Sequence, residues 1–292
     1  MLKYWCYGCL KITELLLLSI LICFSLTPLG GYGGHNLKFL AATLIYYGLT
    51  IFFLRKLNTK KEILFTILIL VSPPALLYIP ITILNFKETQ ISLLSTLGHF
   101  IGLLFGIFTH FITIKSKIIL TILLLLLSIW VSFFGFSYWE NKANYGTFSG
   151  KVSFNLPCNI EGRNQYGKSF SALDYKNKIL VLDFWHTRCG ACFQKFPIVQ
   201  ELFEQYKNDT SILILAINKH INEDTTSQAF DVIKKNGYNF PVLLPSNDKL
   251  PDIFNVESYP TTFIIDKKGK IIFKGDIQFA KSVLADLKKK GL

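Results

Sequence analysis

The chain has 292 residues and a net charge of +12, and its composition is 51% hydrophobic but only 17% charged. Such a composition excludes a water-soluble protein of ordinary makeup and indicates a membrane portion. We expect no nucleic-acid partner, because the lysines of the second half are scattered and are not clustered with aromatic residues in a recognisable motif.

Charged residues are distributed unevenly along the chain. Residues 1–150 contain eleven Lys or Arg and four Asp or Glu, whereas residues 151–292 contain twenty and fifteen. The second half therefore has the charge density of a soluble domain. We predict a membrane domain at residues 1–140, a linker at residues 141–151 and a soluble domain at residues 152–292.

Five apolar segments of the first domain are about long enough to cross a bilayer as helices. They cover residues 12–29, 37–54, 63–84, 91–114 and 118–139. The third contains Pro73, Pro74 and Pro80, which would kink a spanning helix or make the segment re-entrant, leaving four spans. We prefer five spans.

Basic residues in the loops predict the orientation of these spans. With five spans, one side carries Lys3, Lys11, Arg55, Lys56, Lys60, Lys61, Lys115 and Lys117, and the other carries Lys38, Lys87 and Lys142. Positive residues mark the cytoplasmic side. The amino terminus is therefore expected in the cytoplasm and the second domain outside it.

Small and polar residues within the first domain are open to more than one interpretation. Gly98, Gly102 and Gly106 share a helix face and indicate close packing against a neighbouring helix. His99 and His110 lie about 16 Å apart along a helix and cannot share one metal. They are interpreted as histidines near the two interfaces, with separate haem or quinone contacts as the alternative.

Four cysteines lie outside the pair discussed below. Cys6 and Cys9 are interpreted as incidental or lipidated thiols at the membrane surface, with a redox relay or a metal site as alternatives. Cys23 is interpreted as a small apolar residue within the first span. Cys158, placed on an amino-terminal hairpin, is either a spare buried thiol or a resolving cysteine.

The second domain begins with a hairpin and continues as strands alternating with helices. Strands are expected at residues 178–185, 211–218, 261–266 and 270–275, and helices at residues 191–207, 227–237 and 278–290. The fold class is therefore α/β, a mixed sheet flanked by helices and preceded by an all-α transmembrane domain.

Cys189 and Cys192 follow the first buried strand after a short turn. This places Cys189 at a helix amino terminus, where free N–H groups and the helix dipole favour a thiolate. Arg188 adds a positive neighbour, and Cys192 lies one helical turn on, within disulfide reach. The pattern predicts a redox dithiol, and no metal is expected because the domain lacks a second Cys/His pair.

Asp183 interrupts the apolar strand six residues before Cys189. A buried carboxylate is costly unless it is neutral or has a purpose, so we interpret it as the proton acceptor for Cys192, with a pKa raised by burial. The alternative is a carboxylate that faces solvent. Pro197 should kink the following helix.

Several motifs together resemble the thioredoxin fold: Asp183, Trp185, Cys189-Gly190-Ala191-Cys192, Pro197 and Tyr259-Pro260-Thr261-Thr262. The flanking segments resemble the TlpA/ResA branch of the AhpC/TSA redoxin superfamily, membrane-anchored thiol-disulfide oxidoreductases that face the outside of bacterial cells. The resemblance covers residues 152–290. Arg188, where many members carry Trp, and Ala191, where Pro is common, depart from the pattern.

The resemblance implies a site, a location and partners. Pro260 would be a cis-proline facing the dithiol, and Trp185, Arg188, Tyr259 and Thr261 would contact substrate. No cofactor is implied beyond the Cys189–Cys192 disulfide. The chain would lie in the bacterial inner membrane with a periplasmic thioredoxin-like domain. Its implied partners are cysteine-containing extracytoplasmic proteins, with apocytochrome c as one candidate, and an upstream membrane electron donor.

These observations favour a reductase of disulfides in partner proteins. A dithiol oxidase or isomerase remains an alternative, as does a non-enzymatic membrane redox sensor or electron conduit. A peroxidase is less favoured, because such enzymes carry Thr three residues before the reactive cysteine, where this chain has His186. His186 and Thr187 are expected to shape the turn before the dithiol, and His186 could also tune the thiolate.

Overall fold

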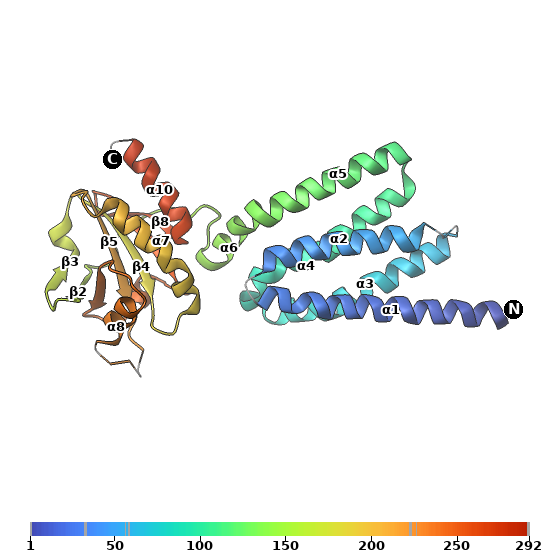
Figure 1. Ribbon diagram of the computed structural model, residues 1–292, viewed down its shortest axis with the longest axis horizontal. Coiled ribbons are helices and arrows are strands. Elements are labelled where there is room, and N and C mark those ends of the chain that lie inside the picture. The colour runs from blue at the N-terminus through green and yellow to red at the C-terminus, as the bar shows by residue number, and fades with distance from the viewer. Residues whose placement is uncertain are drawn as a thin grey trace. The chain divides into compact units, whose positions relative to one another are not determined.

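The computed structural model describes residues 2–31, 34–55, 57, 59–221, 224–225 and 227–290. The side chains of residues 2–12 and 29–31 lie outside this description, so the alternatives for Cys6 and Cys9 stay open. The chain divides into two compact units, Met1–Glu140 and Asn141–Leu292, which we describe separately (Figure 1).

Every regular element that the structure describes in the first unit is a helix. Its helices are α1 (Leu2–Gly31), α2 (His35–Leu54), α3 (Lys60–Leu84), α4 (Phe86–Phe111) and α5 (Ile114–Trp130), and a π-helical turn at Val131–Gly135 joins α5 to α6 (Phe136–Tyr145). Helix α3 begins with a capping box, in which Thr59 Oγ1 accepts from Glu62 N. It is helical across all three of its prolines.

Four helical stretches are long and apolar enough to cross a membrane. They are His35–Leu54, Lys60–Leu84, Phe86–Phe111 and Ile114–Tyr145. The apolar part of α1 within the described side chains, Thr13–Pro28, is shorter. The fifth span and the orientation of the helices therefore stay predictions.

Helices α2 and α4 pack closely through three glycines of α4. A methyl group on Gly102 would lie 2.2 Å from the Thr43 carbonyl oxygen, and one on Gly98 would lie 2.8 Å from the Phe39 carbonyl oxygen. Gly106 faces Thr50 in the same way. The packing interpretation of these glycines is confirmed.

Replacing Gly102 by Ala is expected to destabilise the helical unit by about 1–3 kcal/mol, because the new methyl group must push the α2 backbone away. The matched control is Gly48→Ala in α2, where a methyl group would meet nothing within 4 Å. That control should change stability by less than about 1 kcal/mol. Thermal unfolding of the detergent-solubilised chain compares the two, and equal melting temperatures would contradict the packing account.

The second unit is built on an eight-stranded sheet with the order β1-β8-β7-β4-β5-β6-β2-β3. Its strands are β1 (Lys151–Asn155), β2 (Glu161–Asn164), β3 (Ser169–Ser171), β4 (Ile179–Trp185), β5 (Ile212–Asn218), β6 (Val242–Pro245), β7 (Thr261–Ile265) and β8 (Lys270–Gly275). Strands β4, β5 and β6 are parallel, and the other pairings are antiparallel. The predicted mixed sheet is confirmed.

Helices complete the second unit and cover its sheet. They are α7 (Gly190–Tyr206), α8 (Gln228–Lys235), α9 (Leu250–Ile253) and α10 (Ile277–Lys289) (Figure 1). Alternate residues of β4 point to opposite faces of the sheet. Val181 and Trp185 pack in the same core cluster as residues of α7, α8 and α10, whereas Leu182 and Phe184 pack in the other cluster.

The amino-terminal part of this unit differs from the prediction. Instead of one leading hairpin, β1 pairs with β8 at one edge of the sheet, and the β2–β3 hairpin pairs with β6 at the other. Cys158 is half-buried in the connection between β1 and β2, so its placement on a hairpin is wrong. Residues 141–145 of the predicted linker continue helix α6.

Candidate active site

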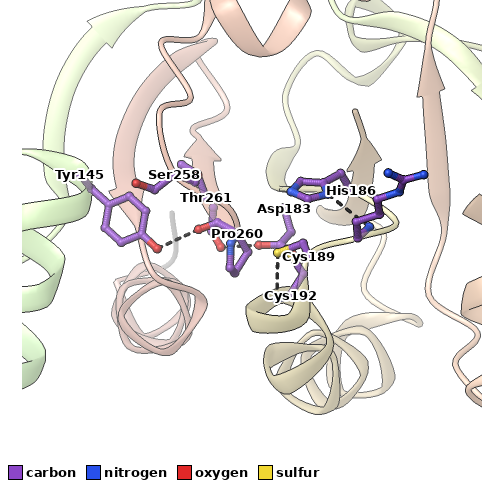
Figure 2. The surroundings of a disulfide bond; sticks show 10 residues. Tyr145, Asp183, His186, Cys189, Cys192, Ser258, Pro260 and Thr261 are labelled. Atoms are coloured by element: carbon purple, nitrogen blue, oxygen red, sulfur yellow. Dashed lines mark hydrogen bonds between the residues drawn. A yellow bond between two sulfur atoms is a disulfide. The ribbon is translucent and has the colours of Figure 1, made fainter. Parts of the chain in front are cut away.

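The dithiol lies where β4 passes into α7. Cys189 is the N-cap of α7, and its Sγ accepts a hydrogen bond from the backbone N of Cys192 at 3.0 Å. The two cysteines form a disulfide (Figure 2). Cys189 is 6% exposed, whereas Cys192 is 0% exposed. Cys189 is thus the less buried of the two cysteines, and the helix terminus that holds it favours its thiolate.

Pro260 precedes β7, the neighbour of β4 in the sheet. The Tyr259–Pro260 peptide bond is cis, as predicted. The β4–β7 register sets Thr261 opposite Phe184 and Thr262 opposite Asp183, which brings the cis-proline to the end of β4 that leads to the dithiol. Figure 2 shows Pro260 and the Asp183 carboxylate turned toward the region of the disulfide.

Asp183 is buried on the side of the sheet that α7 covers, because it lies between Val181 and Trp185 in the alternation of β4. Its Oδ1 accepts a hydrogen bond from Thr262 Oγ1 at 2.7 Å, and its buried Oδ2 has no partner among the described residues. Burial raises the pKa of Asp183 to about 7, opposed by the Thr262 hydrogen bond. The solvent-facing alternative is wrong.

An ion pair between Lys195, one helical turn beyond Cys192, and Asp276 also affects the electrostatic potential at Asp183. Lys195 Nζ lies 3.1 Å from Asp276 Oδ2, and both side chains are partly buried. Asp276 raises the pKa of Asp183 and Lys195 lowers it, both less than burial does. Asp276 is also the N-cap of α10, which fixes its carboxylate.

Two of the predicted substrate contacts belong to the interior instead. Trp185 is 0% exposed and packs edge-to-face on Phe196 of α7. Thr261 is also buried, and its hydroxyl donates to the Ser258 carbonyl oxygen within the cis-proline loop. Both therefore shape the site from behind, and their assignment as substrate contacts is wrong, because strand alternation turns these side chains inward.

Tyr259 and Arg188 lie nearer the surface. The Tyr259 ring packs edge-to-face on His186 at 5.1 Å, and Lys219 Nζ lies 5.6 Å from the ring centroid. Arg188 is exposed, and its backbone N donates to His186 Nδ1 at 3.3 Å. The side chains at this rim are thus aromatic and basic, which keeps a substrate-contacting role for Tyr259 and Arg188 as a prediction.

The turn before Cys189 is held by Asp224, a residue that the sequence analysis did not single out. Thr187 Oγ1 donates to both carboxylate oxygens of Asp224, at 2.9 and 2.7 Å. His186 accepts from the Arg188 backbone, which confirms its expected part in shaping the turn. Burial, followed by Lys219, lowers the pKa of His186, so at neutral pH this ring adds little positive charge beside the dithiol.

Tyr145, which the prediction placed in the linker, also reaches the site. Its hydroxyl donates to the Pro260 carbonyl oxygen at 2.8 Å (Figure 2). Four residues earlier in α6, Asn141 Oδ1 accepts from the backbone N of Asp276 at 3.0 Å. Residues 141–145 are therefore fastened to the cis-proline loop and to the start of α10.

The Tyr145→Phe variant is expected to lower kcat/KM for disulfide exchange about threefold to tenfold, mainly through KM. The change removes one hydrogen bond to the cis-proline loop, which contributes about 1 kcal/mol. Steady-state kinetics with a disulfide-containing protein substrate measures the effect. Tyr166→Phe, whose ring is exposed, is the matched control and should be silent. A Tyr145→Phe enzyme with unchanged KM would contradict this role.

No group of three or more His, Cys, Asp or Glu side chains that could hold a metal ion occurs among the residues that the structure describes. The chemistry available at the site is that of the two sulfurs and the carboxyl group behind them. A reactive cysteine at a helix terminus, a resolving cysteine one turn on and a facing cis-proline define a thiol-disulfide oxidoreductase of thioredoxin-like fold.

Comparison with known proteins gives the family. Residues 152–274 match the AhpC/TSA family. The chain is 30% identical over 128 residues to the thiol-disulfide oxidoreductase ResA of Bacillus subtilis (strain 168), covering 43% of this chain and 69% of that protein. It is 35% identical over 98 residues to ResA of Geobacillus kaustophilus (strain HTA426), covering 34% of this chain and 54% of that protein. The chain belongs to the ResA family of thiol-disulfide oxidoreductases.

Among solved structures, an exposed lipoprotein thioredoxin from Streptococcus pneumoniae strain TIGR4 is 28% identical, with a TM-score of 0.39. That similarity covers 44% of this chain and 100% of the other. The family model ends before the terminal helix α10 and begins after the helical unit. The match therefore concerns the second unit.

Proposed function

We propose that the chain is a membrane-anchored, extracytoplasmic reductase of disulfides in partner proteins. The observation that carries the proposal is the arrangement of the dithiol: Cys189, the less buried cysteine, at the N-cap of α7, a fully buried Cys192 behind it and a cis-proline opposite. Membership of the ResA family supports the exchange chemistry.

The proposed reaction starts from the reduced dithiol. The Cys189 thiolate attacks a disulfide of the partner, forms a mixed disulfide and expels one partner thiolate. The Cys192 thiolate then attacks Cys189 Sγ and expels the second partner thiolate, which leaves the Cys189–Cys192 disulfide. The partner gains two electrons, and a dithiol donor upstream must return two electrons to the enzyme.

Asp183 is proposed as the proton acceptor for Cys192. Cys192 is fully buried, so its thiol cannot pass a proton directly to bulk water. Asp183 is on the same side of the sheet, its Oδ2 is unpartnered among the described residues, and its pKa is raised to about 7. A carboxyl group with a pKa near the working pH is suited to take a proton and return it.

Location and partners are proposed on separate grounds. Four apolar helices long enough to span a bilayer support a multi-pass membrane anchor. With α1 counted as a fifth span, the excess of basic residues in alternate loops supports a cytoplasmic amino terminus and a periplasmic dithiol. The proposed substrates are cysteine-containing extracytoplasmic proteins, with apocytochrome c as one candidate, and the proposed donor is a membrane dithiol protein.

Trapping in intact cells tests the proposal. The Cys192→Ser variant should accumulate a mixed disulfide between Cys189 and its partner, which mass spectrometry identifies. In wild-type cells, Cys189 should be mostly reduced and should react with a membrane-impermeant thiol reagent. If the reagent failed to label Cys189 both before and after the cells were treated with a reductant, the extracytoplasmic placement would be contradicted. A mostly oxidised pair would indicate an oxidase.

A further inference from the structure

A small cavity lies at the edge of the sheet that carries the dithiol, and the exchange reaction described above does not use it. We call it the β5–β6 cavity. Its volume is about 230 Å³, and it is lined by Asn218, the last residue of β5, and by Pro245, the last residue of β6. Because β4, β5 and β6 are parallel, this is also the end of β4 from which the chain enters the dithiol turn. Ligands of such sheets bind outside the carboxyl ends of the strands.

The cavity is tied closely to the turn before the dithiol. Asn218 is the register partner of Trp185, the last residue of β4. After β5, Asp224 accepts the two hydrogen bonds from Thr187 in the dithiol turn, and the next residue, Thr225, lines the cavity. A partner segment that lies against the dithiol can therefore place a neighbouring side chain in the cavity.

Asn218 gives the cavity a buried polar group. Its side chain is 2% exposed, and its Nδ2 is buried without a hydrogen-bond partner among the described residues. It lies on the same face of β5 as Ala216, whose cluster includes Ala229 of α8, and Ala229 also lines the cavity. An amide N–H that is buried without an acceptor is unfavourable. The inner end of the cavity therefore favours a ligand that supplies an acceptor.

The walls and the rim of the cavity have a different chemistry. Ala229, Leu244 and Pro245 form apolar walls. The Asp248 side chain lies at the exposed rim. An ionised carboxylate can only accept hydrogen bonds, and it repels a second carboxylate. The cavity thus presents a donor at its inner end and an acceptor at its rim.

We propose that the β5–β6 cavity binds the side-chain amide of an asparagine or glutamine near the reactive cysteine of the partner protein. The amide oxygen accepts from Asn218 Nδ2, the amide nitrogen donates to the Asp248 carboxylate, and the methylene groups contact Leu244. This inference rests on the proposed function, because it assigns the cavity a part in choosing the partner.

Other side chains match the cavity less well. A glutamate would meet the carboxylate of Asp248, and a lysine would leave Asn218 Nδ2 without an acceptor. An apolar side chain would leave both polar groups without a partner. Only an uncharged group that accepts at one end and donates at the other satisfies both of them, as a carboxamide does.

Reduction of a set of disulfide peptides by the pre-reduced full-length chain tests the proposal. Each peptide carries one internal disulfide and one variable residue, glutamine, glutamate, lysine or leucine, which is moved through the positions next to the cysteines. At one of these positions or more, the second-order rate constant with the glutamine peptide should be about tenfold above that with the other three, because only this side chain pairs both polar groups.

Two variants assign that preference to the cavity. Asn218→Leu should bring the glutamine and leucine peptides to within about twofold of each other. Asp248→Asn should raise the rate with the glutamate peptide to about that of the glutamine peptide, because it removes the repulsion. Asp286→Asn, at an exposed acid of α10, is the matched control and should keep the wild-type preference. Each preference is a ratio of two rates of one variant, so partial loss of fold cancels.

The outcomes separate this inference from the proposed function. If the wild type reduces all four peptides at equal rates at every position, the cavity does not choose the partner and the inference is overturned, while disulfide reduction stands. A glutamine preference that survives both Asn218→Leu and Asp248→Asn would overturn it as well. Failure to reduce any peptide, or insulin, would contradict the proposed function itself.

Discussion

Replacing Cys189 by Ser is expected to reduce disulfide exchange by at least about 10³-fold. A serine hydroxyl is a far weaker nucleophile than a thiolate, and it cannot form the mixed disulfide that carries the reaction. Reduction of insulin by the full-length chain, with a dithiol as electron source, measures the loss. The structure supports this size of effect because Cys189 is the less buried member of the pair.

Cys158 provides the matched control for that experiment. It is a free, half-buried cysteine of the same unit, and burial raises the pKa of its thiol. Cys158→Ser should therefore leave insulin reduction unchanged. A comparable loss in both variants would show that Cys158 takes part in resolution, and full activity in Cys189→Ser would contradict the nucleophile assignment.

Asp183→Asn is expected to stabilise the second unit at high pH and to slow its reaction. Burial raises the pKa of Asp183 from an ordinary 3.8 to about 7. The folded state therefore binds a proton that the unfolded state releases, and wild-type stability falls as the pH rises from about 4 to about 7. Asn has no charge to bury, so the free energy of unfolding of the variant should exceed that of the wild type by at most about 4 kcal/mol at pH 8. Near pH 3 the two should be equally stable.

Urea unfolding of the second unit across this pH range measures the stability difference. Asp231→Asn, an exposed acid on α8, is the control and should show no such trend. In kinetics, Asp183→Asn should slow attack by Cys192 on the mixed disulfide more than it slows the first attack by Cys189. Equal slowing of both steps would contradict the role as proton acceptor, and a constant stability difference at all pH values would contradict the raised pKa.

The sequence predicted the centre of the second unit well, because the signals there are local. The continuous apolar run of β4, the helix after it and the hairpin of β7 and β8 all follow from patterns within a few residues. Asp183 could be recognised because a carboxylate inside such a run is rare and costly. Cis Pro260 came from the resemblance to a known family.

Other parts of the site depend on contacts between distant residues, which periodicity does not reveal. Thr187 and Asp224 are 37 residues apart, and Tyr145 and Pro260 are 115 residues apart. The split of the amino-terminal strands between both sheet edges is a matter of topology, which a local pattern does not specify. Strand β6 and helix α9 are only four residues long, too short for a periodic signal.

Trp185 shows a different kind of error. Its predicted substrate contact came from the family resemblance, but the pleat of β4 sends its side chain into the core beneath α7. A motif position carried over from a family is therefore a weaker guide to substrate contact than the face of the strand on which a side chain lies.

The contacts that residues 141–150 make with the second unit change where a soluble fragment of that unit should begin. Composition alone would start a soluble fragment at residue 152, but such a fragment lacks the Tyr145 donor to Pro260 and the Asn141 acceptor beside Gly275. It would also lack β1 residue Lys151, which pairs with Phe273. A fragment that begins at residue 141 keeps all three, so limited proteolysis should spare this segment even though the sequence reads as a linker.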